Sequence, residues 1–280
     1  MTGTRGWQFW IDRGGTFTDI IGRAPDGRLI AEKRLSEDAL ADRDPGVEGV
    51  LALLERHGGA SPAIEVIRIG TTVATNALLE RRGVPTALLI TAGFGDALAI
   101  GYQERPELFR LRIELPQPLY SEVIEVDERL TAEGEVLRPL DEARLAADLG
   151  RLHGSGIGSV AIVLMHGYRY PDHERRATGI ARRAGFTEVV ASHESSAMIR
   201  LVSRGDTAVV DAYLTPLLAG YARRFRESLG ERFHDVPLQF MQSNGGLVAP
   251  ETFRASNAVL SGPAGGLVGT ARAARALGRS

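Results

Sequence analysis

The chain has 280 residues, of which 44% are hydrophobic and 24% are charged, and its formal net charge at pH 7 is −2. These values are ordinary for a globular protein of one large or two medium domains, and they create no general attraction to nucleic acid or anionic membranes. The chain contains no cysteine, which excludes disulfides, thiol nucleophiles and thiolate metal sites. Because neither a signal-peptide pattern nor a membrane-spanning apolar stretch is found, we expect a cytoplasmic protein without nucleic-acid or membrane partners.

The first third of the chain has the pattern of a β-meander that leads into alternating helices and strands. Asp44 precedes Pro45 and is a suitable N-cap for a helix with proline in its first turn. Thr71 and Thr72 can cap a second helix directly after a strand that ends at Gly70. The expected strands are 7–11, 16–21, 29–35 and 64–69, and the expected helices are 45–57 and 71–82.

The remaining two thirds continue with strands and helices in alternation. Val160 to Met165 is a continuous apolar run, which is typical of a central buried strand. We expect further strands at 85–91, 121–127, 188–191, 238–241 and one ending at Ser261, and helices at 141–153, 171–184, 204–229 and after Ser261. We expect a short helix or turn at 93–101 and irregular structure at 102–118. This order predicts an α/β protein with a mixed sheet.

The segment from Asp12 to Asp19 carries the strongest chemical signal. Two glycines, Gly14 and Gly15, lie in a tight turn between two strands, where backbone N–H groups can closely approach an anion. Thr16 and Thr18 can add hydroxyl donors to phosphate oxygens, whereas a plain hairpin would need neither. Asp12 and Asp19 are candidate catalytic residues and candidate ligands of a hydrated Mg²⁺, which prefers one or two carboxylates together with phosphates.

Two further segments combine a strand end, small or hydroxylated residues and a helix start. Thr71, Thr72 and Asn76 lie at the start of the second helix, where an anion is favoured, although plain helix capping explains the threonines equally well. Gly262, Gly265 and Gly266 open the final helix and can approach a nucleotide, or can simply allow close packing of helix on strand. The only lysine, Lys33, lies outside any glycine-rich turn, so an ATP site here is not a P-loop.

With these residues in view, the chain resembles the hydantoinase A/5-oxoprolinase family and, within it, the ATP-hydrolysing 5-oxoprolinases. The likeness extends over nearly the whole chain, and Arg13 favours the oxoprolinases over plain hydantoinase subunits. It is carried by FWIDRGGTFTDI (9–20), GTTVATNALLER (70–81), GYQER (101–105), AIVLMHGYRYP (161–171), LVSRGDTAVVDAYL (201–214), FMQSNGGL (240–247) and LSGPAGG (260–266).

The resemblance implies an actin/Hsp70-like ATPase fold with two RNase H-like halves. Residues 1–203 are then the N-terminal domain, and residues 204–280 are the start of the hydantoinase A catalytic domain. A second glycine hairpin is expected after LSGPAGG, and the sequence reaches Ser280 without one. We therefore expect a chain truncated before the second half is complete, whose partners are the remaining ATPase half and a hydantoinase B-like region, in a homo-oligomer when complete.

The resemblance also implies an activity, with ATP and Mg²⁺ as cofactors. The complete enzyme would open the lactam of 5-oxo-L-proline to L-glutamate at the expense of ATP, and this portion alone would be inactive. Three alternatives stay open. An ATP-dependent hydantoinase or carboxylase subunit would share the same ATPase half, and a non-catalytic nucleotide-binding fragment would keep the hairpin without turnover. A sugar kinase fits less well, because no aspartate stands in a matching substrate context.

Overall fold

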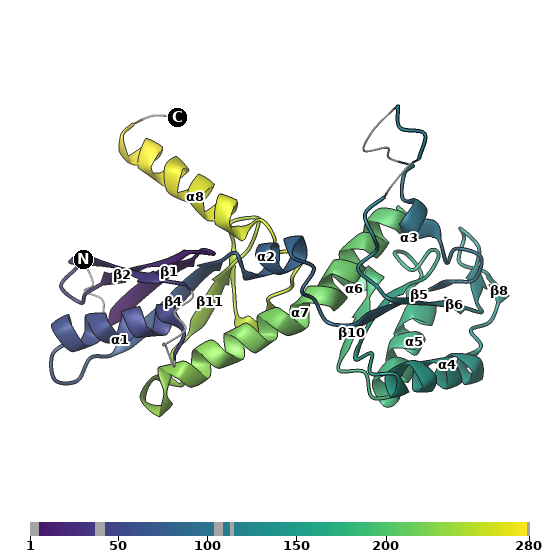
Figure 1. Ribbon diagram of the computed structural model, residues 1–280, viewed down its shortest axis with the longest axis horizontal. Coiled ribbons are helices and arrows are strands. Elements are labelled where there is room, and N and C mark those ends of the chain that lie inside the picture. Colours follow the sequence, from purple (N-terminus) through teal and green to yellow (C-terminus); the bar gives the residue numbers. More distant parts are fainter. Residues whose placement is uncertain (1–5, 37–42, 104–108, 113–114, 279–280) are drawn as a thin grey trace. The chain divides into compact units, whose positions relative to one another are not determined.

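The computed structural model describes residues 6–36, 43–103, 109–112 and 115–278, and it forms two compact units (Figure 1). Met1–Glu80 and Leu217–Ser280 make up the first unit, and Arg81–Pro216 make up the second. The second unit is therefore inserted in the chain of the first. None of the helices in the described ranges is both long enough and apolar enough to cross a membrane.

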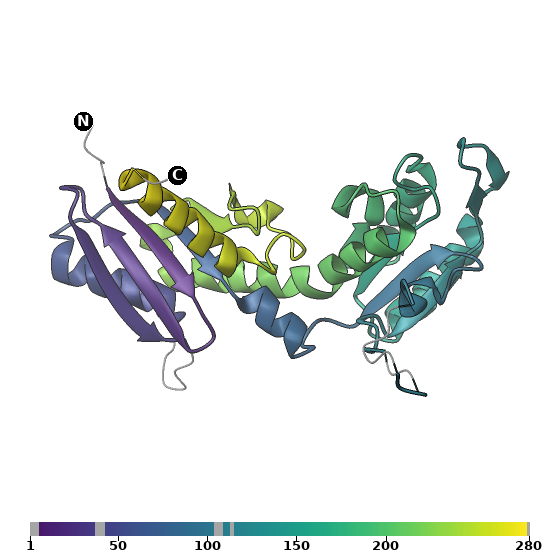
Figure 2. The ribbon, with the colours of Figure 1, turned by 90° about the horizontal axis from the view of Figure 1, so that it is seen from above.

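The first unit is built on a six-stranded mixed sheet in the order β12-β11-β4-β1-β2-β3. Its strands are β1 (Trp7–Arg13), β2 (Phe17–Arg23), β3 (Leu29–Leu35), β4 (Ile64–Thr71), β11 (Leu238–Met241) and β12 (Leu247–Val248). The first three strands form the expected antiparallel meander, visible as neighbouring purple arrows in Figure 2. Because β4 runs parallel to both β1 and β11, the predicted α/β class with a mixed sheet is confirmed.

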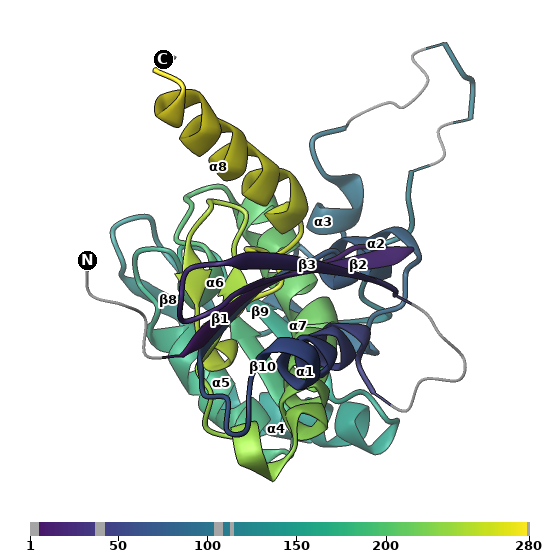
Figure 3. The ribbon, with the colours of Figure 1, turned by 90° about the vertical axis from the view of Figure 1, so that its left-hand side faces the viewer.

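Helices lie on both faces of this sheet. The helices are α1 (Pro45–His57), α2 (Val73–Leu79), the second part of α7 (Leu201–Leu229), the short η1 (Glu231–Phe233) and η2 (Pro250–Thr252), and α8 (Ser261–Ala276). Figure 3 shows α1 and α7 on one side of the sheet and α8 on the other. The predicted N-cap of α1 is confirmed, because Gly46 N donates to Asp44 Oδ1 over 2.9 Å.

Strand alternation divides the first unit into a buried face and an open face. Phe9, Ile11 and Ile20 point into the core beneath α1 and α7 and are almost completely buried. Gly49 lets α1 approach β2, since a Cβ there would lie 2.6 Å from Ile20 Cδ1. On the α7 side, Tyr221 contacts Phe240 of β11 edge to face at 6.2 Å. The residues between these core positions in β1 and β2 face the opposite side, where α8 begins.

The second unit has a parallel sheet in the order β10-β9-β5-β6, covered on both faces. Its strands are β5 (Thr86–Thr91), β6 (Glu122–Val126), β9 (Ser159–Val163) and β10 (Glu188–Ala191), with a separate hairpin β7 (Arg129–Leu130) and β8 (Val136–Arg138). Its helices are α3 (Ala97–Ile100), α4 (Glu142–Gly154), α5 (Asp172–Arg183), α6 (Ser192–Ser195) and the first part of α7. Leu89 and Ile162 face α4 and α5, whereas Leu88 and Ile90 face α7.

Two hydrogen-bonded networks in the second unit contain buried charged side chains. Glu174 accepts from Leu164 N at 2.9 Å, from Ser192 Oγ at 2.6 Å and from His193 N at 3.0 Å. Arg204 donates to Ser192 Oγ at 2.8 Å and to the Leu164 carbonyl at 2.6 Å. In the other network, Glu128 pairs with His173 at 2.7 Å and accepts from the Thr91 hydroxyl. These contacts satisfy side chains that would otherwise destabilise the core.

Two expectations for local structure are wrong. No strand ends at Ser261: residues 253–260 form turns that follow η2, and the Leu260 N–H donates to Ser243 Oγ at 3.0 Å instead of joining the sheet. Helix α2 ends at Leu79 rather than at Arg82, because Arg81 adopts a left-handed backbone with φ of 55° that a helix cannot contain. Part of the segment 102–118, expected to be irregular, lies outside the described residues.

Candidate functional site

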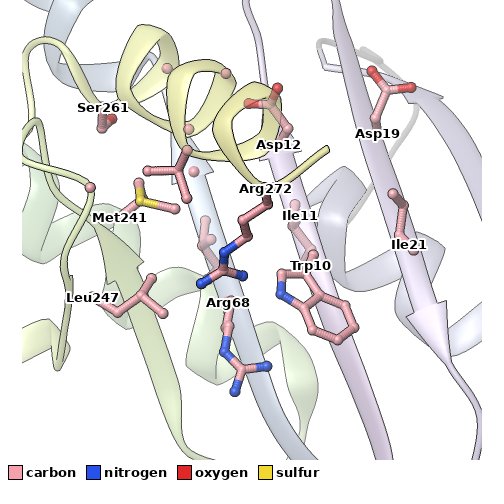
Figure 4. Close-up of a pocket in the computed structure, with 18 of the residues that line it drawn as sticks. Trp10, Ile11, Asp12, Asp19, Ile21, Arg68, Met241, Leu247, Ser261 and Arg272 are labelled. Carbon is pink, nitrogen blue, oxygen red and sulfur yellow. The ribbon is translucent and has the colours of Figure 1, made fainter. Parts of the chain in front are cut away.

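A cleft of about 710 Å³ lies on the open face of the first unit's sheet. Its walls come from β1, β2, β4, β11 and β12 on the sheet side and from α8, between Ser261 and Arg272, on the other side (Figure 4). Asp12 and Asp19 lie at one end, and two arginines lie farther along the sheet. All three glycine-containing segments singled out in the sequence border this cleft or lie next to it.

The β1–β2 hairpin places two carboxylates side by side. Asp12 and Asp19 are cross-strand partners in register, and both line the cleft. Gly14 N donates to the Phe17 carbonyl over 3.0 Å and closes the turn. A Cβ at Gly15 would lie 3.3 Å from Asn76 Nδ2, so the turn lies against α2. The hairpin, which is the first predicted segment, thus lies against the second one.

Asp12 is the less neutralised of the two carboxylates. Burial in the cleft raises its pKa, and the nearby charge of Asp19 raises it further. The space beside it is open, because its neighbour on β4 is Gly70, where a Cβ would lie 3.6 Å from Asp12 Oδ1. Asp19, by contrast, forms an exposed ion pair with Lys33 at 2.8 Å. Asp12 is therefore the carboxylate with more capacity for a further cationic partner.

The two threonines of the hairpin face different surroundings. Thr18 points to the opposite side of β2 from Asp19 and is fully buried, with its hydroxyl 2.9 Å from Ser36 Oγ. Ser36 in turn donates to the Gly14 carbonyl at 2.7 Å, so this hydroxyl pair stabilises the hairpin from below. Thr16 is exposed at the turn, and its carbonyl accepts from Ser36 N at 2.9 Å.

The junction of β4 and α2 is bonded to the hairpin and to α8. Thr72 N donates to the Arg13 carbonyl at 3.0 Å, and Asn76 Nδ2 lies 3.4 Å from Thr72 Oγ1. The Thr71 carbonyl accepts from the buried Ser261 hydroxyl at 2.9 Å. Thr71 does not cap α2 from the N-cap position, which Thr72 occupies without a side-chain capping bond, although Val73 N donates to Thr71 Oγ1 at 3.2 Å.

The glycines at the start of α8 line the cleft opposite Asp12. Gly262, Gly265 and Gly266 all belong to its wall. A Cβ at Gly262 would lie 3.6 Å from the Thr72 methyl carbon, whereas nothing lies within 4 Å of a Cβ at Gly265 or Gly266. The distance at Gly262 is an ordinary van der Waals contact, so close packing requires glycine at none of the three positions, and Gly265 and Gly266 leave backbone open to the cleft.

A partly buried cation supports the hairpin from the core side. Arg13 forms an ion pair with Asp44, the N-cap of α1, and its guanidinium lies 5.0 Å from the ring centre of Tyr221. Burial raises the pKa of Asp44, and the charge of Arg13 partly opposes that rise. In the sequence, Arg13 stands out only through the family resemblance, and no local pattern connects it with Asp44, because 31 positions separate the two residues.

Trp10, Arg68 and Arg272 also line the cleft, and the sequence analysis missed them. The signal for Trp10 was present, since residues two apart on a strand share a face and Asp12 was already a candidate. Arg68 and Arg272 carry no local motif. They line the same cleft as Trp10 only because β4 pairs with β1 and α8 crosses the same face.

The donor set at the hairpin fits Mg²⁺ better than a metal held by protein alone. Within the described ranges no group of three or more His, Cys, Asp or Glu side chains lies close enough to hold an ion. Mg²⁺ needs only one or two carboxylates when phosphates and water complete its shell. Asp12 and Asp19, beside a glycine turn, have that composition.

Comparison with known proteins identifies the family. A family model described as the hydantoinase/oxoprolinase N-terminal region matches residues 8–185, and a second, described as hydantoinase/oxoprolinase, matches residues 204–280. The chain belongs to the hydantoinase/oxoprolinase family. The 5-oxoprolinase 1 of Arabidopsis thaliana is 44% identical in an alignment that covers 94% of this chain. The 5-oxoprolinase of Dictyostelium discoideum is 39% identical, again over 94% of this chain.

Solved structures agree with this assignment. The ATP-dependent caprolactamase of Pseudomonas jessenii superposes with a TM-score of 0.78 at 33% identity, covering 92% of this chain and 39% of that one. A nucleotide-free acetone carboxylase has a TM-score of 0.79 at 22% identity, covers 97% of this chain and 41% of that one, and is similar in fold. The expected ATPase fold is thereby confirmed. The chain spans 23% of the length of the oxoprolinases that it matches.

Proposed function

We propose that this chain is the N-terminal portion of an ATP-dependent 5-oxoprolinase and contributes the first phosphate-binding hairpin of its ATP site. The observation that carries the proposal is the convergence of the β1–β2 hairpin, the β4–α2 junction and the start of α8 around one cleft. The oxoprolinase relatives, aligned over 94% of the chain, support the choice of reaction. The proposed reaction converts 5-oxo-L-proline, ATP and water to L-glutamate, ADP and phosphate.

The residues at the hairpin end have distinct proposed roles. The backbone around Gly14 and Gly15, together with the Thr16 hydroxyl, donates hydrogen bonds to phosphate oxygens. Asn76, which lies against Gly15, orients the turn and extends this donor set. Gly265 and Gly266 leave the opposite wall open, so a nucleotide can approach the backbone of α8.

Asp12 and Asp19 are the proposed holders of Mg²⁺, with Asp12 as the principal ligand because Lys33 already neutralises Asp19. When bound, the ion would neutralise the phosphate charge during phosphoryl transfer. The carboxylate of Asp12 must be ionised for this task. Since burial raises its pKa, ionisation of Asp12 requires a higher pH than that of an exposed aspartate.

The low reactivity of the lactam in the proposed reaction explains why ATP is required. An amide carbonyl is a poor electrophile, and transfer of the γ-phosphoryl group to the lactam oxygen makes the ring carbon open to attack by water. The sites for water activation and for the second phosphate grip would come from the downstream ATPase half and a hydantoinase B-like region. On this proposal the present chain by itself is inactive.

A second candidate is an ATP-dependent hydrolase of another cyclic amide. One observation favours it: the caprolactamase subunit alpha of Pseudomonas jessenii is 34% identical over 92% of this chain and is covered to 38% of its own length. Both candidate functions use the same ATPase half, so they differ only in the lactam that is hydrolysed. A nucleotide-binding protein without turnover is the candidate of a different class.

The experiment compares phosphate release by the complete protein, this chain with its downstream region, in the presence of different lactams. We expect release that requires both Mg²⁺ and 5-oxo-L-proline. Release with caprolactam or hydantoin instead would replace the proposed substrate. ATP binding without lactam-dependent release from any of them would support the non-catalytic class. Calorimetry on residues 1–280 with Mg·ATP checks the proposed incompleteness, for which we expect no tight binding.

A further inference from the structure

The guanidinium of Arg68 has an unusual environment on the open face of the sheet. It projects from the middle of β4 into the cleft and lies 5.2 Å from the ring centre of Trp10. Its Nη1 atom is buried, yet within the described residues it has no hydrogen-bond partner. A buried donor on a charged group is costly when unpaired, so this atom requires an acceptor.

A second arginine reaches the same part of the cleft from the other wall. Arg272 extends from α8 into the cleft, and Figure 4 shows its guanidinium in the part of the cleft that also holds Arg68 and Trp10. Among the described residues Arg272 forms no ion pair within 4.0 Å. The two carboxylates that line the cleft, Asp12 and Asp19, lie toward its hairpin end. The cleft therefore has an acidic end and a basic end.

The basic end is small and largely apolar. Trp10 and Ile21 on the meander, and Met241 and Leu247 on the neighbouring strands, complete its walls. Two arginines among apolar side chains suit a compact molecule with one anionic group, because guanidinium pairs well with a planar carboxylate and the walls cover the rest. A triphosphate, with several charges and strong hydration, suits the glycine hairpin better.

The separation of the two ends is also informative. Trp10 and Asp12 are two residues apart on β1, which is roughly 7 Å at the rise of an extended strand. A carboxylate held beside Trp10 leaves the rest of a small ring directed toward the hairpin end. The reacting carbonyl oxygen of such a molecule can then face a phosphate bound there.

We propose that Arg68 and Arg272, with Trp10 as an apolar wall, form the subsite that binds the carboxylate of a lactam acid and thereby distinguish it from neutral lactams. This inference rests on the proposed function, which it makes more specific. Neutral rings such as 2-pyrrolidinone, which has the same lactam without the carboxylate, lack the group that would pair with the two arginines.

The test uses the complete protein and two pairs of comparisons. The variants are Arg68→Gln, Arg68→Lys and Arg272→Gln, and the control is Arg28→Gln, which removes an equal charge from an exposed turn where Arg28 pairs with Asp26. We measure KM and kcat for ATP hydrolysis with 5-oxo-L-proline and with 2-pyrrolidinone. Binding of 5-oxo-L-proline is measured separately by calorimetry, which needs no turnover.

We expect Arg68→Gln and Arg272→Gln to raise the KM and the Kd for 5-oxo-L-proline about 10- to 100-fold, the range for loss of a charged hydrogen bond. The KM for ATP and the turnover with 2-pyrrolidinone should change by less than about twofold in each variant. Arg68→Lys keeps the charge but loses the planar fork, so it should recover only part of the affinity. Arg272 is exposed on its helix, so its variant should fold normally.

Each outcome decides between the two proposals. Lactam-dependent turnover with an unchanged KM in both glutamine variants would overturn the subsite and leave the proposed function standing. Binding of 5-oxo-L-proline that is lost in these variants, without any turnover, would support the subsite and overturn the function. If 5-oxo-L-proline neither binds nor stimulates ATP hydrolysis, both are wrong. Equal losses with 2-pyrrolidinone would mean that the arginines serve the fold or ATP.

Discussion

In the second unit helices cover both faces of the parallel sheet, and two of its buried acids, Glu128 and Glu174, are hydrogen-bonded on both carboxylate oxygens. The first unit leaves one sheet face open, and there Asp12 and Arg68 make no ion pair within the described residues. In the first unit the ion pair of Arg13 with Asp44 is compensated in the same way, but the charges on the open face of the sheet are not. The unpaired charges of the first unit therefore lie in the cleft that we propose as the ATP and lactam site.

The largest expected effect comes from breaking the compensation in the second unit. Replacement of Arg204 by glutamine removes donors from Ser192 Oγ and the Leu164 carbonyl and leaves Glu174 without its nearby cation. Loss of one member of a buried charged network costs about 3–5 kcal/mol of unfolding free energy. Chemical denaturation measures this loss. Arg176→Gln, which breaks an exposed pair with Glu142, should change stability by about 0.5 kcal/mol at most.

For the unpaired Asp12 we expect a loss of activity without a loss of stability. Asp12→Asn in the complete protein should lower kcat/KM for Mg·ATP about 10³-fold, equal to about 4 kcal/mol. Because its folded pKa is raised, the charged carboxylate opposes folding above its unfolded pKa, so the variant should be no less stable at pH 7, and slightly more stable. The wild-type rate should fall as pH drops through that raised pKa, and the variant should lack this dependence.

Steady-state kinetics across pH and a parallel denaturation series measure both effects. Asp26→Asn, in the next turn along the meander, is the matched control, because Asp26 forms an exposed pair with Arg28 at the surface. A variant that loses activity together with stability would contradict the assignment of Asp12 to a ligand, and would place it among the structural charges.

A smaller effect on stability is expected at Asp44, a carboxylate of the first unit that is paired inside the protein. Asp44→Ala removes the cap of α1 and the partner of Arg13, and should cost about 2 kcal/mol. Asp44→Asn keeps a capping oxygen and should cost less than about 1 kcal/mol. The reason is that burial raises the pKa of Asp44, so its negative charge opposes folding above its unfolded pKa, and loss of the charge alone costs no stability at neutral pH. Equal losses in both variants would show that the ion pair matters more than the cap.

The smallest expected effects are those of the two hairpin threonines, one on stability and the other on ATP binding. Thr18→Val removes a buried hydroxyl from Ser36 and should cost about 1 kcal/mol of stability with an unchanged KM for ATP. Thr16→Val should leave stability unchanged and raise the KM for ATP, because its exposed hydroxyl is a proposed phosphate donor. Denaturation and ATP kinetics on the two variants test this division, and the reverse pattern would contradict it.

Much of the fold follows from local sequence patterns. The meander, the N-cap at Asp44 and the buried strand β9 were all predicted, because turn residues, caps and apolar runs act over a few positions. The missing strand before Ser261 shows the limit of such patterns. Small and apolar residues there resemble a strand, but turns tied to Ser243 by hydrogen bonds determine the structure.

The site was predictable in outline and not in composition. The glycine segments were found, and alternation alone would have shown that Thr18 cannot share a face with Asp19. Arg68 and Arg272 are 204 positions apart in the sequence and carry no motif, so only strand pairing and the course of α8 bring them to one cleft. Recognition of the cluster required knowing which donors remain unpaired, which is a property of the folded chain.

The insertion of the second unit has a consequence for the order of folding. The second unit is one uninterrupted stretch, Arg81–Pro216, so all its strands are available to one another as soon as it leaves the ribosome. The first unit needs β4 to pair with β11, and more than 160 residues separate them, since β4 ends at Thr71 and β11 begins at Leu238. Closing such a long loop is slow, so β11 pairs with β4 only after the inserted unit has formed. The cleft is therefore the last part of this chain to be assembled during synthesis.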